Sequence, residues 1–290
     1  MSMHIALTFD DNFWAPAFAT MRSVCLFTPQ REELVFHLCH RTLTPEHKAD
    51  LEAIRDEFPV TLKWYDLDQS EMFRDIAARM PENRRLSNIV YARLMIDRLV
   101  DEDVERILYL DCDMLVRDDV AWLFDLHLEG NAIAAVRDTI GAQITNGRDV
   151  SRNRDIFDPG DYYFNAGMIL IDVAKWRAAD VLGQMEKAYA DGVMQRIYYD
   201  QDLLNLIFRR NWLKLPWRWN LIDPKPPHES LDPAIIHYTG DNKPWGILST
   251  KVPTVAFPRL YRHTMKNELF HRFARHRWKR WWLKKLRLAR

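Results

Sequence analysis

The chain has 290 residues, of which 48% are hydrophobic and 28% are charged. This size and composition allow one large or two small domains with a full core, and they exclude a wholly disordered chain. The formal net charge is zero, but the 22 residues after Glu268 hold nine Arg and Lys and no acid, so residues 1–268 carry a net charge of −9. An acidic body with a basic end indicates a tail that binds a surface.

The cysteine content and the hydrophobic runs indicate the cellular setting. Cys25, Cys39 and Cys112 show no Cys-x-x-Cys spacing, which argues against a zinc site or a disulfide framework and favours a reducing environment. No run approaches 18 uninterrupted apolar residues, and the first residues lack a leader pattern. We therefore expect a cytoplasmic protein with no membrane-spanning helix.

Strand-like and helix-like segments alternate through the first half of the chain. Strands are predicted at residues 4–9, 34–38, 60–65 and 106–110; the first reads as buried, and the third alternates between apolar and polar residues. Helices are predicted at residues 16–24, from 45 onward, and at 89–99. Thr44 is placed as the N-cap of the second helix because Pro45 suits the first helical position. This alternation predicts an α/β fold with a largely parallel sheet covered on both faces.

The second half continues the pattern less regularly. Further strands are predicted at residues 132–136, 168–171 and 235–238, and a helix is predicted from Asp200. The polar segment from Arg137 to Asp161 is long for a connection in a compact domain, so it is either a lid over the substrate or a loose loop.

Asp111 and Asp113 directly follow the apolar strand at 106–110. In open α/β sheets, ligands bind outside the carboxyl ends of the strands. Two carboxylates at such an edge suit a divalent cation that keeps waters and holds phosphates, which indicates a nucleotide-linked substrate. A solvated turn is the alternative interpretation of an isolated Asp-x-Asp.

Two further polar motifs flank predicted elements. Asn165-Ala166-Gly167 precedes a buried strand, where glycine permits a close backbone approach to a ligand; a plain bulge is the alternative. Asp200-Gln201-Asp202 opens a helix, where the acids cap the helix or, with the amide, bind sugar hydroxyls.

His237 ends the last predicted strand and leads into Gly240 and Lys243. A glycine turn followed by a lysine is a plausible phosphate loop. A strand-end histidine is commonly structural, but added to Asp111 and Asp113 it would give a mixed nitrogen and oxygen ligand set that tolerates manganese.

Together these segments resemble glycosyltransferase family 8, especially the bacterial lipopolysaccharide and lipooligosaccharide glucosyl- and galactosyltransferases. The motifs occur in the family's order: Asp10-Asp11-Asn12, Tyr91-Ala92-Arg93-Leu94, Leu-Tyr-Leu-Asp-x-Asp, Tyr-Phe-Asn-Ala-Gly, Asp-Gln-Asp, and His-Tyr-x-Gly-x-x-Lys-Pro-Trp. The resemblance covers roughly residues 4 to 250. It implies the A-type glycosyltransferase fold, which is Rossmann-like and binds nucleotides, with a UDP-hexose donor and retention of anomeric configuration.

The resemblance also implies residue roles. It assigns Asp111, Asp113 and His237 to Mn²⁺, with Mg²⁺ as the alternative cation. It assigns the following residues to the UDP-sugar: Thr8, Asp10, Asp11, Asn12, Arg93, Asp111, Cys112, Asp138, Asn165, Ala166, Gly167, Gly240 and Lys243. Thr8, Cys112 and the Asp241-Asn242 pair depart from the family pattern without removing a ligand. The catalytic region is Asp200, Gln201 and Asp202. An amide is a poor nucleophile, so same-face substitution is favoured over a covalent intermediate.

Residues 251–290 are predicted as a basic amphipathic tail behind a catalytic domain at 1–250. Aromatic residues from Phe270 to Trp282 recur at helical spacing among Arg and Lys, which suits an anionic membrane interface. The alternatives are a helix docked on the body and nucleic-acid binding, and the acidic body argues against the latter.

The sequence therefore predicts a metal-dependent hexosyltransferase that extends a lipid-linked glycan at the inner face of the plasma membrane. The alternative enzyme is a magnesium phosphohydrolase of the haloacid dehalogenase type, whose signature also ends a strand in Asp-x-Asp. A catalytically silent sugar-nucleotide or membrane-binding module is the third hypothesis.

Overall fold

The computed structural model describes residues 2–81, 87–138, 155–158, 161–246 and 254–286. Its central sheet has seven strands in the order β3-β2-β1-β4-β7-β6-β8, and a second sheet has the order β5-β10-β9. The central strands are β1 (Met3–Asp10), β2 (Leu34–Arg41), β3 (Thr61–Asp66), β4 (Arg106–Leu110), β6 (Ile133–Arg137), β7 (Phe164–Asp172) and β8 (Trp212–Leu215). The strands of the second sheet are β5 (Met114–Val116), β9 (Leu221–Ile222) and β10 (Ile235–His237).

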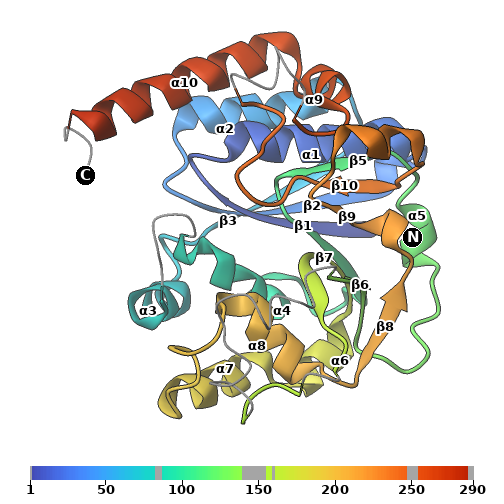
Figure 1. Ribbon diagram of the computed structural model, residues 1–290, viewed down its shortest axis with the longest axis vertical. Coiled ribbons are helices and arrows are strands. Elements are labelled where there is room, and N and C mark those ends of the chain that lie inside the picture. The colour runs from blue at the N-terminus through green and yellow to red at the C-terminus, as the bar shows by residue number, and fades with distance from the viewer. Residues whose placement is uncertain (1, 82–86, 139–154, 159–160, 247–253, 287–290) are drawn as a thin grey trace.

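Helices cover both faces of the central sheet (Figure 1). On one face lie α1 (Trp14–Phe27), α2 (Pro45–Glu52), α9 (Pro258–Met265) and α10 (Asn267–Lys285). On the other lie α3 (Glu71–Arg79), α4 (Ile96–Leu99), α6 (Val173–Ala178), α7 (Val181–Ala190) and α8 (Tyr199–Ile207). A short helix, α5 (Ala121–Phe124), and 3₁₀ segments complete the described elements: η1 (Arg31–Glu33), η2 (Ala53–Asp56), η3 (Asn88–Met95), η5 (Trp217–Trp219) and η6 (Pro226–Ser230).

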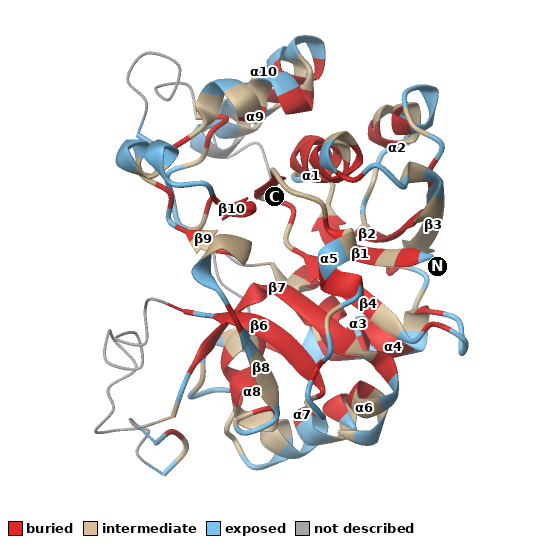
Figure 2. Cartoon of the chain, turned by 90° about the vertical axis from the view of Figure 1, so that its right-hand side faces the viewer, coloured by how far each residue is buried: buried red, intermediate tan, exposed pale blue. Residues whose placement is uncertain are grey.

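Each face of the sheet has its own apolar core, because side chains alternate along a strand. In β4, Leu108 and Leu110 belong to the core beneath α1 and α10, whereas Ile107 and Tyr109 belong to the core beneath η3, α4 and α8. All four side chains are almost completely buried. Figure 2 shows the same burial along β4, β6 and β7, which lie in the middle of the molecule. The buried interior holds the strand ends, and therefore the site, in place.

The predicted α/β class and mainly parallel sheet are confirmed, with one reversal. β1 pairs in parallel with β2 and β4, β2 with β3, and β6 with β8. β7 runs antiparallel to both β4 and β6. The start of β7, and not its end, therefore lies at the carboxyl edge of its neighbours. This reversal brings Asn165, Ala166 and Gly167 to the same edge as Asp111, whose backbone N–H donates to the Gly167 carbonyl at 2.7 Å.

Local predictions differ from the structure in three places. Residues 89–99 begin as the 3₁₀ segment η3 and become α-helical only at Ile96. Asn165, Ala166 and Gly167 lie within β7, not before it. The predicted strand at 235–238 is β10, which belongs to the second sheet. The predicted lid from Arg137 to Asp161 lies mainly outside the described residues.

The predicted tail helix forms as α10, and its first half packs on the body. Leu269, Phe270 and Phe273 are buried in the core that also contains α1. Arg272 forms ion pairs with Asp50 at 2.6 Å and Glu46 at 3.0 Å, both in α2. Within the described ranges, no helix is long and apolar enough to span a membrane.

Candidate functional site

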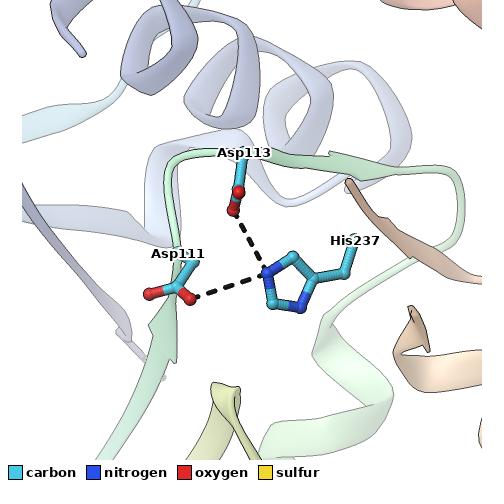
Figure 3. Close-up of side chains that lie close together, drawn as sticks. All are labelled: Asp111, Asp113 and His237. Atoms are coloured by element: carbon cyan, nitrogen blue, oxygen red, sulfur yellow. Dashed lines mark ion pairs between the residues drawn. The ribbon is translucent and has the colours of Figure 1, made fainter. Parts of the chain in front are cut away.

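The structure brings Asp111, Asp113 and His237 together from different segments (Figure 3). The two acids follow β4, and His237 ends β10. His237 Nε2 lies 3.2 Å from Asp113 Oδ1 and 3.6 Å from Asp111 Oδ2. One ligand atom from each residue lies within 4.8 Å of the other two. Two carboxylates and an imidazole at this separation form a candidate divalent-metal centre with mixed oxygen and nitrogen donors.

The surroundings of His237 fit a ligand role. Its Nδ1 atom faces the Asn220 side-chain oxygen at 3.1 Å, and this contact orients the ring so that Nε2 is the atom that faces the two acids. Gly167 packs directly against the imidazole: a Cβ at this position would lie 2.2 Å from His237 Cε1 and 2.8 Å from Asp111 Oδ2. Only glycine leaves room for this arrangement.

Lys243 places a positive charge beside Asp113. Its ammonium group donates to Asp113 Oδ2 at 2.5 Å and also to the Tyr238 carbonyl. Burial alone would raise the pKa of Asp113, but Lys243 and His237 outweigh it and hold the pKa of that carboxyl well below its usual range. Asp113 is therefore a carboxylate that attracts positive charge, as a metal ligand must be.

Arg93 connects Asp111, in the candidate metal centre, to Asp200 in α8. Its guanidinium forms ion pairs with Asp111 at 3.0 Å and Asp200 at 2.7 Å and donates to the Ala166 carbonyl at 2.5 Å. Burial would lower the pKa of Arg93, but Asp111 and Asp200 raise it above its ordinary value. Arg93 is thus a fixed positive charge in the middle of the site.

Gln201 is fixed in position by four hydrogen bonds. Its oxygen accepts from the Ala166 backbone at 3.0 Å and the Asn165 side chain at 3.3 Å. Its nitrogen donates to Asp138 at 3.2 Å and to the Tyr163 hydroxyl at 3.1 Å. This network joins the ends of β6, β7 and α8 and presents polar groups suited to sugar hydroxyls.

The two acids beside Gln201 lie in different surroundings. Burial raises the pKa of Asp200 to about 6 despite its ion pair with Arg93. Asp202 is buried and accepts from the Tyr163 hydroxyl at 2.5 Å and the Tyr198 backbone at 2.6 Å. Both carboxylates are therefore engaged by neighbouring groups.

A cavity of about 950 Å³ connects these groups. The predicted site residues that line it are Asn12, Arg93, Asp111, Asp113, Asp138, Asn165, Asp200, Gln201, His237, Gly240 and Lys243. The predicted residues that do not line it are Thr8, Asp10, Asp11, Cys112, Ala166, Gly167 and Asp202.

The predicted residues outside the lining support it from behind. Asp10 accepts from the Asn12 backbone at 2.8 Å and side chain at 3.0 Å, which orients Asn12. Asp11 turns to His47 at 2.7 Å. Thr8 bonds the Tyr109 hydroxyl at 2.9 Å, and the buried Cys112 thiol, whose pKa burial raises, faces the Thr8 carbonyl. Their contacts are with protein groups rather than with the cavity.

Sequence reasoning missed several lining residues. Phe13 and Trp245 both line the cavity and meet edge to face, with ring centroids 6.1 Å apart. Other missed lining residues are Val90, Tyr198, Ile222, Asp223, Lys225, Thr239, Phe273, His276, Arg277, Arg280 and Trp281. The helical spacing of Phe273, Arg277, Arg280 and Trp281 was visible in the sequence, but nothing in it indicated that this face meets the site.

The fold and the geometry agree with comparisons to known proteins. The structure resembles that of the galactosyltransferase LgtC in complex with donor and acceptor sugar analogs, with a TM-score of 0.75 and 27% identity, over 91% of this chain and 95% of that one. The fold is therefore the A-type glycosyltransferase fold. The chain belongs to glycosyl transferase family 8, because the sequence model of that family matches residues 4–248.

Proteins with related sequences differ in length, and they carry different names. General stress protein A of Bacillus subtilis is 26% identical over 95% of this chain and 94% of its own length. Lipopolysaccharide 1,3-galactosyltransferase of Salmonella typhimurium is 27% identical over 83% of this chain and 72% of its own. The match to glycosyltransferase GlyF of Streptococcus pneumoniae covers 86% of this chain but only 58% of that protein. Family membership makes the chain a glycosyltransferase and removes the phosphohydrolase alternative.

Proposed function

We propose that the protein transfers galactose or glucose from a UDP-sugar to a lipid-linked glycan, with Mn²⁺ and with retention of configuration. The observation that carries this proposal is the cavity itself, which is lined by two groups of residues: the acids and imidazole of Asp111, Asp113 and His237, and the amides of Asn165 and Gln201. A diphosphate beside a metal and a hexose beside amides fit this division of the lining.

The residue roles follow from this placement. Asp111, Asp113 and His237 would hold the cation, which as a Lewis acid would stabilise charge on the departing diphosphate. Lys243, beside Asp113 and next to the Gly240 turn, would add a positive charge to the same oxygens. The proposed hexose contacts are Arg93, Asp138, Asn165, Asp200 and Gln201, and the proposed uridine-side residue is Asn12.

The surroundings of the acids favour same-face substitution over a covalent intermediate. Asp202 accepts hydrogen bonds from Tyr163 and the Tyr198 backbone, and Asp200 is paired with Arg93. Gln201 lines the cavity, but an amide is a poor nucleophile. The acceptor hydroxyl would then attack from the side the diphosphate leaves, and the leaving-group oxygen would take its proton.

A glycolipid acceptor is supported by the tail and by the relatives. The Salmonella relative is named for lipopolysaccharide. Trp278 and Trp282 recur along one face of α10, Leu286 directly follows its end, and the three side chains are 46–60% exposed, as amphipathic helices in a membrane interface require. The formal charge of the tail would attract anionic lipid, and this face of α10 would hold the enzyme at the membrane.

The donor is tested by incubating the chain with Mn²⁺ and a panel of UDP-sugars, with and without a lipooligosaccharide acceptor, while UDP release is measured. UDP-galactose or UDP-glucose is expected to be hydrolysed slowly alone and faster with the acceptor. Absence of UDP release from every sugar would contradict the proposal.

Membrane attachment is tested with a full-length double variant, Trp278→Ser/Trp282→Ser, and vesicles of phosphatidylglycerol. Co-sedimentation is expected to fall about tenfold or more, since interfacial binding scales with buried apolar area. The matched control is Trp122→Ser, because Trp122 is 68% exposed on α5, outside the tail. Equal vesicle binding by the double variant and the control would overturn the role of the tail.

A further inference from the structure

The second half of α10 forms a wall of the cavity as well as an exposed surface. Phe273, Arg277, Arg280 and Trp281 all line the cavity, and their spacing places them on one face of the helix. Trp278 and Trp282 lie on an adjoining face, where their rings contact the ring of Trp281. The two faces of α10 therefore meet different surroundings, and the cavity face carries two guanidinium groups.

The position of α10 against the cavity is fixed by packing. Phe273 is 2% exposed and meets the Trp14 ring edge to face, with centroids 5.0 Å apart. Phe273 also contacts the Trp245 ring, with centroids 6.1 Å apart. Arg277 donates to the Trp245 carbonyl at 3.3 Å. Because Trp245 is two residues after Lys243, Arg277 is attached to the loop proposed to hold the diphosphate.

The charges of the cavity single out the two arginines. The other Arg and Lys residues of its described lining are each paired with a carboxylate: Arg93 with Asp111 and Asp200, Lys225 with Asp223, and Lys243 with Asp113. In the part of the chain that the structure describes, Arg277 and Arg280 have no carboxylate partner. Guanidinium groups pair strongly with phosphate oxygens, so an anionic ligand would complete this wall.

We propose that Arg277 and Arg280 bind the diphosphate of the nucleotide donor, so that the C-terminal helix is part of the donor site. This inference rests on the proposed function, which supplies the UDP-sugar. It predicts an effect that membrane attachment alone would not produce. With no lipid present, substitutions on the cavity face of α10 should weaken the binding of a soluble nucleotide.

The test is a calorimetric titration of the full chain with UDP in the presence of Mn²⁺. Arg277→Gln and Arg280→Gln are each expected to weaken UDP binding about tenfold, the effect of losing one charged hydrogen bond. The matched control is Lys279→Gln, which removes one charge from another face of the same helix and should bind UDP within about twofold of the wild type.

Two further arms separate the alternatives. Arg277→Lys keeps the charge and is expected to retain part of the UDP affinity lost in Arg277→Gln, which a purely structural role of Arg277 would not produce. Binding to phosphatidylglycerol vesicles is expected to be equal in Arg277→Gln, Arg280→Gln and Lys279→Gln, because each loses one of many positive charges. The source of the phosphate, nucleotide or lipid headgroup, is thereby distinguished.

The outcomes are distinct. The inference would be overturned if Arg277→Gln and Arg280→Gln bound UDP with the same affinity as Lys279→Gln. It would also be overturned if these two variants lost vesicle binding but kept their affinity for UDP. If the wild-type chain itself failed to bind UDP with Mn²⁺, the proposed function would fall, and the inference with it.

Discussion

The edge that carries Asp111 and the helix α10 hold their charges in opposite ways. At the edge, Asp111, Asp113 and Arg93 each contact an opposite charge, and Gly167 leaves no room for a methyl group. On the second half of α10, Trp278 and Trp282 are exposed, and Arg280 has no ion pair with any described residue. The edge is built for one arrangement of its own groups, whereas the second half of α10 carries exposed aromatic and basic groups, which we propose contact a membrane and a nucleotide.

The comparison leads to different expectations for substitutions. Changes at the edge should act on chemistry with large effects, because each group positions the others. Changes where α10 docks should act on stability with small effects that depend on salt.

The largest effect is expected for Asp113→Ala. Turnover with Mn²⁺ should fall about a thousandfold or more, since the variant loses both a cation ligand and the partner of Lys243. The unfolding midpoint should change by about 4 °C or less, because a strand-end acid buries little apolar surface. Turnover across a Mn²⁺ titration and circular dichroism measure the two effects; full activity or gross unfolding would contradict the assignment.

Gly167→Ala tests how closely the edge is packed. The added Cβ would collide with His237 and Asp111, so metal affinity should fall about 10- to 100-fold and stability by about 1–3 kcal/mol. Gly192→Ala is the control: it strains a left-handed backbone with φ of +70° but meets no atom within 4 Å. An equal loss of metal affinity in both variants would show that general destabilisation is responsible.

Asp200→Asn tests the burial of charge at the edge. Burial raises the pKa of Asp200 to about 6, so between about pH 4 and 6 the unfolded chain releases this proton while the folded chain keeps it. Stability from this group is therefore full at lower pH and is lost as the pH rises through about 6, by up to about 3 kcal/mol. The variant should show a flatter dependence of unfolding free energy on pH over that window; an unchanged slope would refute the assignment.

The smallest effect is expected for Arg272→Gln, where α10 docks on α2. Loss of the ion pairs with Asp50 and Glu46 should cost about 1 kcal/mol at low ionic strength and less at high salt. The control is Arg275→Gln, since Arg275 forms no ion pair with the described residues and should change stability by about 0.5 kcal/mol or less. Chemical denaturation of both variants at two salt concentrations gives the comparison; a cost that did not depend on salt would exclude an electrostatic origin.

The sequence predicted most of the edge because its chemistry is local. Asp111 and Asp113 end an apolar strand, and Lys243 follows a glycine turn, so each motif could be placed at a strand end before any contact was known. The reversal of β7 could not be predicted, because the hydrophobic run at 168–171 reads the same in either direction. Because β7 is reversed, its start lies beside the end of β4, where Gly167 packs against His237.

The wall formed by α10 depends on tertiary packing that periodicity does not contain. The aromatic and basic spacing indicated an amphipathic helix, but the same spacing fits a membrane, a docked helix or both. Only the packing of Phe273 against Trp14 and Trp245 shows which face meets the cavity. Asp202 shows the reverse case: the family resemblance placed it in the catalytic region, but it does not line the cavity and accepts a hydrogen bond from the Tyr163 hydroxyl.

The most direct test of the account is electron paramagnetic resonance of Mn²⁺ titrated into the chain with and without UDP. We expect one Mn²⁺ per chain, tighter Mn²⁺ binding when UDP is present, and loss of this site in both Asp113→Ala and His237→Ala. Equal Mn²⁺ binding by the wild type and these two variants, or an affinity that UDP does not change, would contradict the proposed metal centre.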